Sequence, residues 1–287
     1  MSGLGDRQTE YDYVKQLILK YPENDDLRRR LRILELQFNF DLAGLSYTYT
    51  TFDRSGIGPW HLGSAQYNRQ REWGSLSGRI NYADRLADGS SIADGVQYEL
   101  ESYFFSGKNS YTYLGAAYSS DQVFPTWRLG ASYFQNLGKG WEADIGMRYN
   151  KVFDDREFYT AAAGVSKYLG NYWIYLRAFL QNEEDKYYPA FVLTNRYFLN
   201  TRFDYLSLVL GFGTSPDERA TLGQFENRVS TESYRINAGY FRFLNDRYLI
   251  GVQLGYNYQE YLPGFFQNEI ELFFSLQYKL GKNGFKK

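Results

Sequence analysis

Apolar and polar residues alternate along most of this chain, in runs of about ten residues separated by turn-forming segments. From Trp141 to Asn150 the odd-numbered positions are apolar or aromatic, and the even-numbered positions are charged, polar or glycine. Because successive side chains of a strand point to opposite faces, each run predicts a strand with two differently solvated faces. Aromatic residues mark the ends of many runs, a pattern typical of a transmembrane β-barrel.

The runs predict an all-β fold, a transmembrane antiparallel up-and-down β-barrel of about 14 strands with a short N-terminal helical segment. Twelve or sixteen strands also fit, because boundaries drawn from sequence are uncertain by about two to four residues. We expect strands near 45–52, 60–70, 75–85, 94–104, 110–119, 126–136, 141–151, 157–168, 171–181, 188–198, 203–213, 232–243, 247–259 and 266–280.

The start of the alternating region changes parity. Between Ile33 and Leu42 the even-numbered positions are apolar, whereas after Gly44 the odd-numbered positions Leu45, Tyr47 and Tyr49 take over. A β-bulge inserts one residue and reverses the faces beyond it, so this change predicts a bulge or a local break at Gly44.

Residues 1–32 differ from the rest and are expected to form a periplasmic helical lead-in to a barrel of residues 33–287. Val14, Leu17, Ile18 and Tyr21 share one helical face, and Pro22 ends that helix. The segment is either a short amphipathic helix pair or the end of a tetratricopeptide array. Residues 9–32 are the part that would dock a periplasmic protein partner.

The connections between runs differ in length on the two sides of the predicted barrel. Alternate connections, such as Gly107-Lys108-Asn109, are tight and are expected to face the periplasm. The others are more variable, including residues 86–93, and are expected to face outside. The longest runs from Thr214 to Ser230 and is the best candidate for a binding loop or a lid.

The face opposite the apolar one carries charges of both signs. These side chains either line an aqueous pore or pair across strands and fill a constricted lumen, which we favour over an open porin. Arg79 with Glu99 or Glu101 on the next strand is the first ion pair that we expect, because a charge in a narrow lumen needs a partner. The predicted lumen-lining or binding residues are Arg79, Gln97, Glu99, Glu101, Arg128, Asp144, Arg148, Tyr175, Arg177, Arg196, Arg235 and Asn237.

The five tryptophans lie at the ends of predicted strands. Indole is apolar with one polar N–H, so it prefers the headgroup layer of a membrane. We therefore expect an interface girdle, with Trp60 and Trp127 at the outer side and Trp73, Trp141 and Trp173 at the periplasmic side. The contacting partners of such a barrel are outer-membrane lipid and lipopolysaccharide.

Composition narrows the function classes. Aromatic residues make up 20% of 287 residues, which favours strands, and no run of eighteen apolar residues predicts a transmembrane helix. A net charge of −1 gives no basic footprint for nucleic acid. Cysteine is absent, and no motif for a metal or a cofactor is present. No leader opens the chain, so we expect a precursor with a signal peptide to deliver it to the outer membrane of a Gram-negative bacterium.

The single histidine, His61, is the candidate residue for an enzymatic function. His61 lies near the outer end of its predicted strand, with Ser64 three residues later. A serine nucleophile needs its general base within hydrogen-bond reach. Residues three apart in a strand face opposite sides, so we expect His61 and Ser64 not to meet, and we expect no enzyme activity.

Several segments together resemble the YaiO-type outer-membrane β-barrel family over about residues 45–280. They are residues 59–61, 79–85, 124–131, 140–149, 164–173, 195–198 and 211–216. The resemblance implies an outer-membrane barrel and no catalytic residues. Members of the family often follow tetratricopeptide segments and accompany glycosyltransferases, which implies a link to surface polysaccharide.

The sequence therefore predicts a conduit or accessory for export of surface polysaccharide through a constricted polar lumen. A non-transporting scaffold that docks a periplasmic partner is the first alternative, and a lipid-modifying enzyme is the second.

Overall fold

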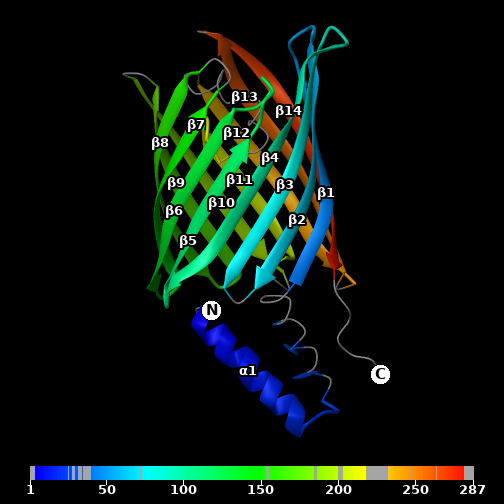
Figure 1. Ribbon diagram of the computed structural model, residues 1–287, viewed down its shortest axis with the longest axis vertical. Helices are drawn as coiled ribbons and strands as arrows, with labels where there is room; N and C mark the ends of the chain where they lie inside the picture. Colours follow the sequence, from blue (N-terminus) through cyan, green and yellow to red (C-terminus); the bar gives the residue numbers. More distant parts are fainter. Residues whose placement is uncertain are drawn as a thin grey trace.

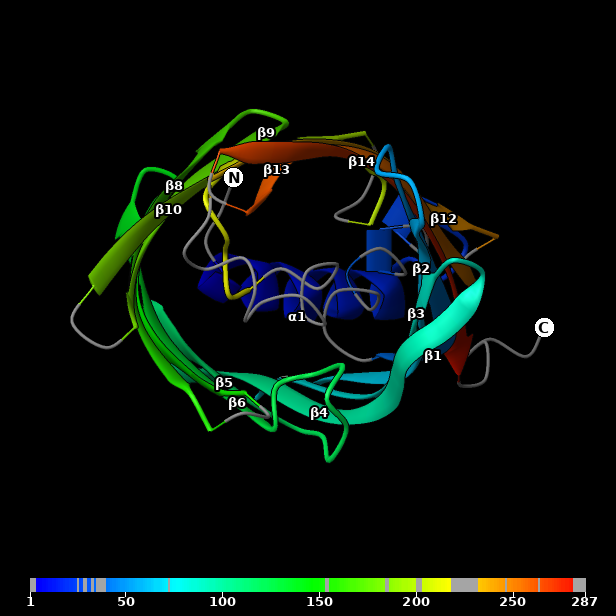
Figure 2. The ribbon, with the colours of Figure 1, turned by 90° about the horizontal axis from the view of Figure 1, so that it is seen from above.

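The computed structural model describes residues 4–24, 26–27, 30–31, 34, 40–71, 73–152, 155–183, 186–199, 203–217, 232–245, 247–262 and 264–280. Within these residues, fourteen antiparallel strands close into a barrel, as the alternation predicts (Figures 1 and 2). Each strand pairs with its neighbours in sequence, and the first pairs with the last.

The strands and the helix have the following bounds: α1 (Leu4–Lys20), β1 (Phe40–Phe52), β2 (Ile57–Arg71), β3 (Gly74–Ala87), β4 (Ser90–Gly107), β5 (Ser110–Tyr118), β6 (Trp127–Gly138), β7 (Trp141–Lys151), β8 (Glu157–Leu169), β9 (Tyr172–Glu183), β10 (Lys186–Phe198), β11 (Tyr205–Phe212), β12 (Ser233–Leu244), β13 (Tyr248–Leu262) and β14 (Phe265–Leu280).

The two ends of the barrel differ. The end that carries α1 and most of the short hairpin turns is called the turn end, and the opposite one the loop end (Figure 1). At the turn end, Val14 of α1 packs against Leu31 and Leu34, so the helical lead-in buries part of its apolar face on itself. Nothing in the described residues forms a helix capable of crossing a bilayer.

The outer face of the barrel is a continuous apolar belt. Aliphatic side chains that would be buried in a water-soluble protein are exposed here, as a bilayer-facing surface requires. Examples from eleven of the fourteen strands are Leu45, Ile80, Leu100, Leu114, Leu129, Ile145, Leu176, Leu193, Leu208, Leu254 and Leu272.

Residues 86–93 are not a long loop. β3 and β4 continue almost to each other and are joined at Asp88 and Gly89, which both have positive φ. An Asp-Gly pair with two positive φ angles is a turn that matches the twist of a hairpin. The prediction of a variable connection at residues 86–93 was therefore wrong.

The bulge or break predicted at Gly44 was also wrong. β1 pairs with β2 and with β14 in unbroken register from Asp41 to Thr50. The parity change has another cause, because Phe40 and Leu42 point into the lumen and pack with Leu249 in an apolar cluster at the turn end. Residues 35–39, where the earlier part of the pattern falls, lie outside the described residues.

Gly44 is required by the close approach of β1 and β14. A Cβ added there would lie 2.6 Å from the Cα of Gln277. We expect Gly44→Ala to lower the free energy of unfolding by about 1–3 kcal/mol, because the closing strands have to separate. Urea titration in phospholipid vesicles measures this loss.

Gly63 on β2 provides the control, since a Cβ there meets nothing within 4 Å. Gly63→Ala should leave stability unchanged or slightly raised, because it only restricts the unfolded chain. Equal losses for the two variants would contradict the assignment of Gly44 to a steric role.

The loop end of the same seam is held by Asp53. Its carboxylate accepts a hydrogen bond of 2.9 Å from the backbone N–H of Asn268 and another from the Asn268 side chain. These bonds, the backbone one first, hold the pKa of Asp53 below its ordinary value. The first hairpin is thereby tied to β14 beyond the membrane-spanning residues.

Candidate functional site in the barrel lumen

The lumen contains a cavity of about 500 Å³ between the barrel wall and the segment that follows β11. Glu99, Glu101 and the rings of Tyr103, Tyr113 and Phe134 form part of its wall, and Pro216 and Asp217 enter it from the loop end. Five arginines from five strands complete the lining, namely Arg79, Arg128, Arg148, Arg177 and Arg196.

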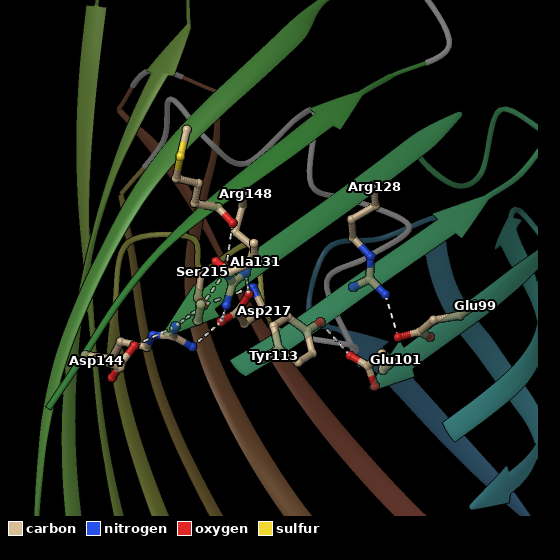
Figure 3. Close-up of polar contacts among 12 residues, drawn as sticks. Glu99, Glu101, Tyr113, Arg128, Ala131, Asp144, Arg148, Ser215 and Asp217 are labelled. Carbon is tan, nitrogen blue, oxygen red and sulfur yellow. Dashed lines mark hydrogen bonds and ion pairs between the residues drawn. The ribbon is translucent and has the colours of Figure 1, made fainter. Parts of the chain in front are cut away.

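Two arginines and two glutamates form the first ion cluster (Figure 3 labels Glu99, Glu101 and Arg128). Arg79 donates to both carboxylate oxygens of Glu99, at 3.0 and 2.6 Å, and also pairs with Glu101. Arg128 pairs with Glu99 at 2.7 Å, and the hydroxyl of Tyr113 donates to Glu101 at 2.8 Å. The cluster is neutral as a whole, and it contains the ion pair expected from the sequence, Arg79 with Glu99 or Glu101.

The second ion cluster is built around Arg148 and Arg177 (Figure 3 labels Arg148, Asp144 and Asp217). Arg177 pairs with Asp144 at 2.8 Å, and Tyr175 donates to the same carboxylate at 2.6 Å. Both arginines also pair with Asp217, Arg148 through Nε at 2.5 Å and Arg177 through Nη1 at 2.7 Å. Asp144 belongs to the barrel wall, whereas Asp217 comes from the connection after β11.

The chain turns into the lumen at Gly213. This residue has a φ of 69°, which other residues rarely adopt, and a Cβ there would lie 2.6 Å from the carbonyl oxygen of Pro189. The next residues are buried, and Gln181 donates to the carbonyl oxygen of Thr214 at 2.5 Å. Residues 213–217 therefore narrow the lumen, and residues 218–230 of the predicted binding loop lie outside the described residues.

All twelve predicted lumen residues lie on the inward face of their strands. Seven of them line the cavity directly, and Asp144 and Tyr175 support Arg177 from behind. Gln97 contacts the first cluster through Asn81. Arg235 and Asn237 lie on β12 and do not line the cavity.

Two of the five predicted girdle tryptophans face inward. Trp173 stacks on Tyr175 with centroids 5.3 Å apart and lies under the guanidinium of Arg196 at 5.0 Å. Trp60 pairs in register with the buried Thr50 and donates to the carbonyl oxygen of Leu86 at 3.2 Å. Their assignment to the girdle is corrected. The other three, Trp73, Trp127 and Trp141, are exposed at the strand ends or in the adjoining turn.

Sequence reasoning missed several residues of the site, among them Tyr103, Tyr113, Ser132, Phe134 and Asp217. The first four share the parity of inward residues on their own strands, so alternation alone was enough to find them. Asp217 follows Ser215 and Pro216 in a connection, where no strand parity applies, and only its loop had been singled out.

His61 and Ser64 lie on opposite faces, as their spacing predicts. The Nδ1 atom of His61 lies 2.6 Å from the hydroxyl of Tyr47 on the outer face. Ser64 donates to Asn81 at 2.7 Å on the lumen side. The geometry therefore gives the serine hydroxyl no histidine base.

Two solved structures share this architecture at low sequence identity. One, described as a bacterial polysaccharide outer membrane secretin, has a TM-score of 0.53 and 9% identity over 85% of this chain and 99% of that chain. The other, described as the CymD monoaromatic hydrocarbon channel, has a TM-score of 0.53 and 9% identity over 87% of this chain and 90% of that chain. At such identities both show the fold alone.

No curated protein sequence matches the chain. The family described as the YaiO membrane beta barrel domain matches residues 41–218, which is more than half of the chain and includes all the residues that line the cavity, Asp217 among them. The resemblance found in the sequence is thereby confirmed, and the chain belongs to the YaiO membrane β-barrel family.

Proposed function

We propose that this outer-membrane β-barrel is a conduit or accessory for passage of surface polysaccharide through its constricted polar lumen. The observation that carries the proposal is the cavity of about 500 Å³, in which aromatic rings and charged side chains lie together. This volume falls within the range of about 300–1,000 Å³ that ligand pockets in proteins occupy.

The lining has the two kinds of group that a sugar chain needs. The rings of Tyr103, Tyr113 and Phe134 present flat apolar surfaces, on which the C–H faces of a pyranose ring can stack. Arginine and carboxylate groups beside them can exchange hydrogen bonds with hydroxyl groups. That a polysaccharide secretin has the same fold supports the proposal at the level of architecture. For export, the turn end of the barrel, with its short connections and α1, would face the periplasm, and the loop end would face outside.

Flux through vesicles tests the proposal with a variant that fills the cavity. Gly130 lines the cavity from β6. Full-length protein in liposomes should release a trapped acidic tetrasaccharide, and Gly130→Trp should reduce the release rate about tenfold or more, because the indole occupies the passage.

Gly63→Trp is the matched control, since that position is on the outer face and open. It should release the sugar at the rate of the unsubstituted protein. Release no faster than from protein-free liposomes, or equal rates for the two tryptophan variants, would remove the conduit role.

The scaffold remains the second candidate because α1 and the residue that follows it keep apolar side chains uncovered. Tyr13, Leu19 and Tyr21 are exposed at 61%, 82% and 59%. Deletion of residues 1–32 separates the two roles. A conduit loses no flux, whereas a scaffold loses its periplasmic partner and shows no protein-dependent flux with or without the deletion.

A further inference from the structure

Asp217 is held in the lumen as a tethered carboxylate. The Nε and Nη2 atoms of Arg148 donate to its two oxygens at 2.5 and 2.9 Å, and Arg177 adds a third bond of 2.7 Å. Side-on contact through two parallel N–H groups is the way in which a guanidinium recognises a free carboxylate. The Asp217 side chain still keeps 30% of its surface exposed to the cavity.

The barrel wall fixes both guanidinium groups without help from Asp217. The Nη1 atom of Arg148 donates to the carbonyl oxygens of Ala131 and Met147, at 2.9 and 2.8 Å. The hydroxyl of Ser132 accepts from Arg148 at 2.9 Å and from Arg177 at 2.8 Å. We call these two arginines the arginine cradle. A cradle ordered in advance loses little entropy when an anion binds, which favours affinity.

The charged groups of the cavity wall do not balance, even with Asp217 in place. Five arginines line the cavity, and the strands around them supply three paired carboxylates, Glu99, Glu101 and Asp144. These eight groups therefore carry an excess of two positive charges, and Asp217 reduces it to one. An enclosed site of this kind attracts anions and concentrates them.

The remaining excess lies at Arg196. Among the described residues no carboxylate pairs with it, and its neighbours are the rings of Trp173 and Tyr205, both 5.0 Å from the guanidinium. A sugar carboxylate bound beside the cradle would meet Arg196 as a second cation, with the rings of Trp173 and Tyr205 as neighbouring apolar surface.

We propose that the arginine cradle is the binding site for the carboxylate of an acidic sugar, a uronic acid unit, and that Asp217 occupies it in the absence of that ligand. The inference rests on the proposed function and deepens it by naming the substrate class. The incoming carboxylate takes over the bonds of Arg148 and Arg177, and Asp217 gives up its position. Binding thus competes with an internal group of the same chemistry.

Equilibrium binding in detergent micelles tests the inference with the full chain. The probes are a linear tetramer of galacturonic acid and the neutral maltotetraose, measured by calorimetry at low salt. We expect the acidic tetramer to bind at least about tenfold more tightly, because each charge-assisted hydrogen bond discriminates by that order. The preference should shrink as salt rises.

The most decisive comparison uses a variant that removes the carboxylate of Asp217 from the cradle. Asp217→Asn should tighten binding of the acidic tetramer about tenfold and leave maltotetraose unchanged, because a larger fraction of the protein then has an empty cradle. Arg148→Gln should weaken binding of the acidic tetramer about ten- to hundredfold. Arg69→Gln, which removes an exposed guanidinium paired with Asp41 at 3.2 Å, is the control and should change neither.

Heat-modifiable migration on gels verifies that each variant has folded. If Arg148→Gln fails to fold, Arg148→Lys replaces it, because lysine keeps the charge and lacks the two parallel N–H groups. Arg148→Lys should weaken binding of the acidic tetramer about tenfold. Equal affinity for the two tetramers, or an Asp217→Asn variant that binds the acidic one no better, would overturn the inference.

The failures of the two proposals are distinguishable. Selective binding of the acidic tetramer without flux leaves the site and removes the conduit. Flux that is the same for acidic and neutral tetramers, and unchanged in Asp217→Asn, leaves the conduit and removes the site.

Discussion

Replacing Ile145 with arginine should lower the free energy of unfolding by about 2–4 kcal/mol, the cost of an arginine on the lipid face near the middle of a bilayer. Ile145 lies near the middle of β7, and 67% of its surface is exposed on the outer face. An exposed isoleucine on a water-soluble protein tolerates this substitution with little change in stability. The size of the loss therefore reports the solvent that the outer face meets.

Leu137 provides a control that is equally exposed but differs in depth. Its exposed fraction is 62%, and it is the residue before the last of β6, next to the turn end. Leu137→Arg should cost about 0–1 kcal/mol, because an arginine at the interface reaches the headgroups. Both variants are compared by urea titration in vesicles of one phospholipid. Equal and small losses at the two positions would contradict a membrane-spanning β7.

The alternation of side chains along each strand predicted most of the lumen wall, because it alone decides which face of the barrel a residue occupies. It paired Arg79 with Glu99 or Glu101 on the next strand, and the structure shows Arg79 and Glu99 as register partners, with Glu101 also bound to Arg79. The prediction was wrong where the position of a residue along its strand was used instead of its parity. Trp173 was assigned to the girdle from its position at a strand end, although it shares its face with Tyr175 and Arg177.

Local chain geometry was the part that alternation could not supply. The apolar residues Phe40 and Leu42 suggested that β1 changes which side faces the lipid. They face the lumen instead, because an apolar cluster can also lie inside the turn end of a barrel. The entry of Asp217 into the lumen depends on the positive φ of Gly213. A glycine at the end of a run permits that turn but does not specify its direction. The wall of the site was therefore predictable from sequence, and the group that occupies it was not.

Replacing Arg79 with alanine should strongly lower the free energy of unfolding, because Arg79 belongs to a buried ion cluster in the lumen. The side chains of Arg79 and Glu99 are only 4% and 2% exposed, so Arg79→Ala leaves two carboxylates with one arginine, Arg128, in a poorly hydrated place. Breaking a buried ion pair by removing one partner costs about 3–5 kcal/mol. We expect a loss of this size in the free energy of unfolding, measured by the same titration.

Two further variants decide whether this loss arises from the uncompensated charge. Arg71 pairs with Asp41 at 2.8 Å, with side chains 30% and 21% exposed, so Arg71→Ala should cost no more than about 1 kcal/mol. Combining Arg79→Ala with Glu101→Gln leaves Arg128 and Glu99 as a balanced pair. The double variant should recover more than half of the loss, because neighbouring charges in one network are not additive. If it is as unstable as Arg79→Ala alone, the lost packing of the arginine side chain, and not charge balance, determines the stability of the lumen wall.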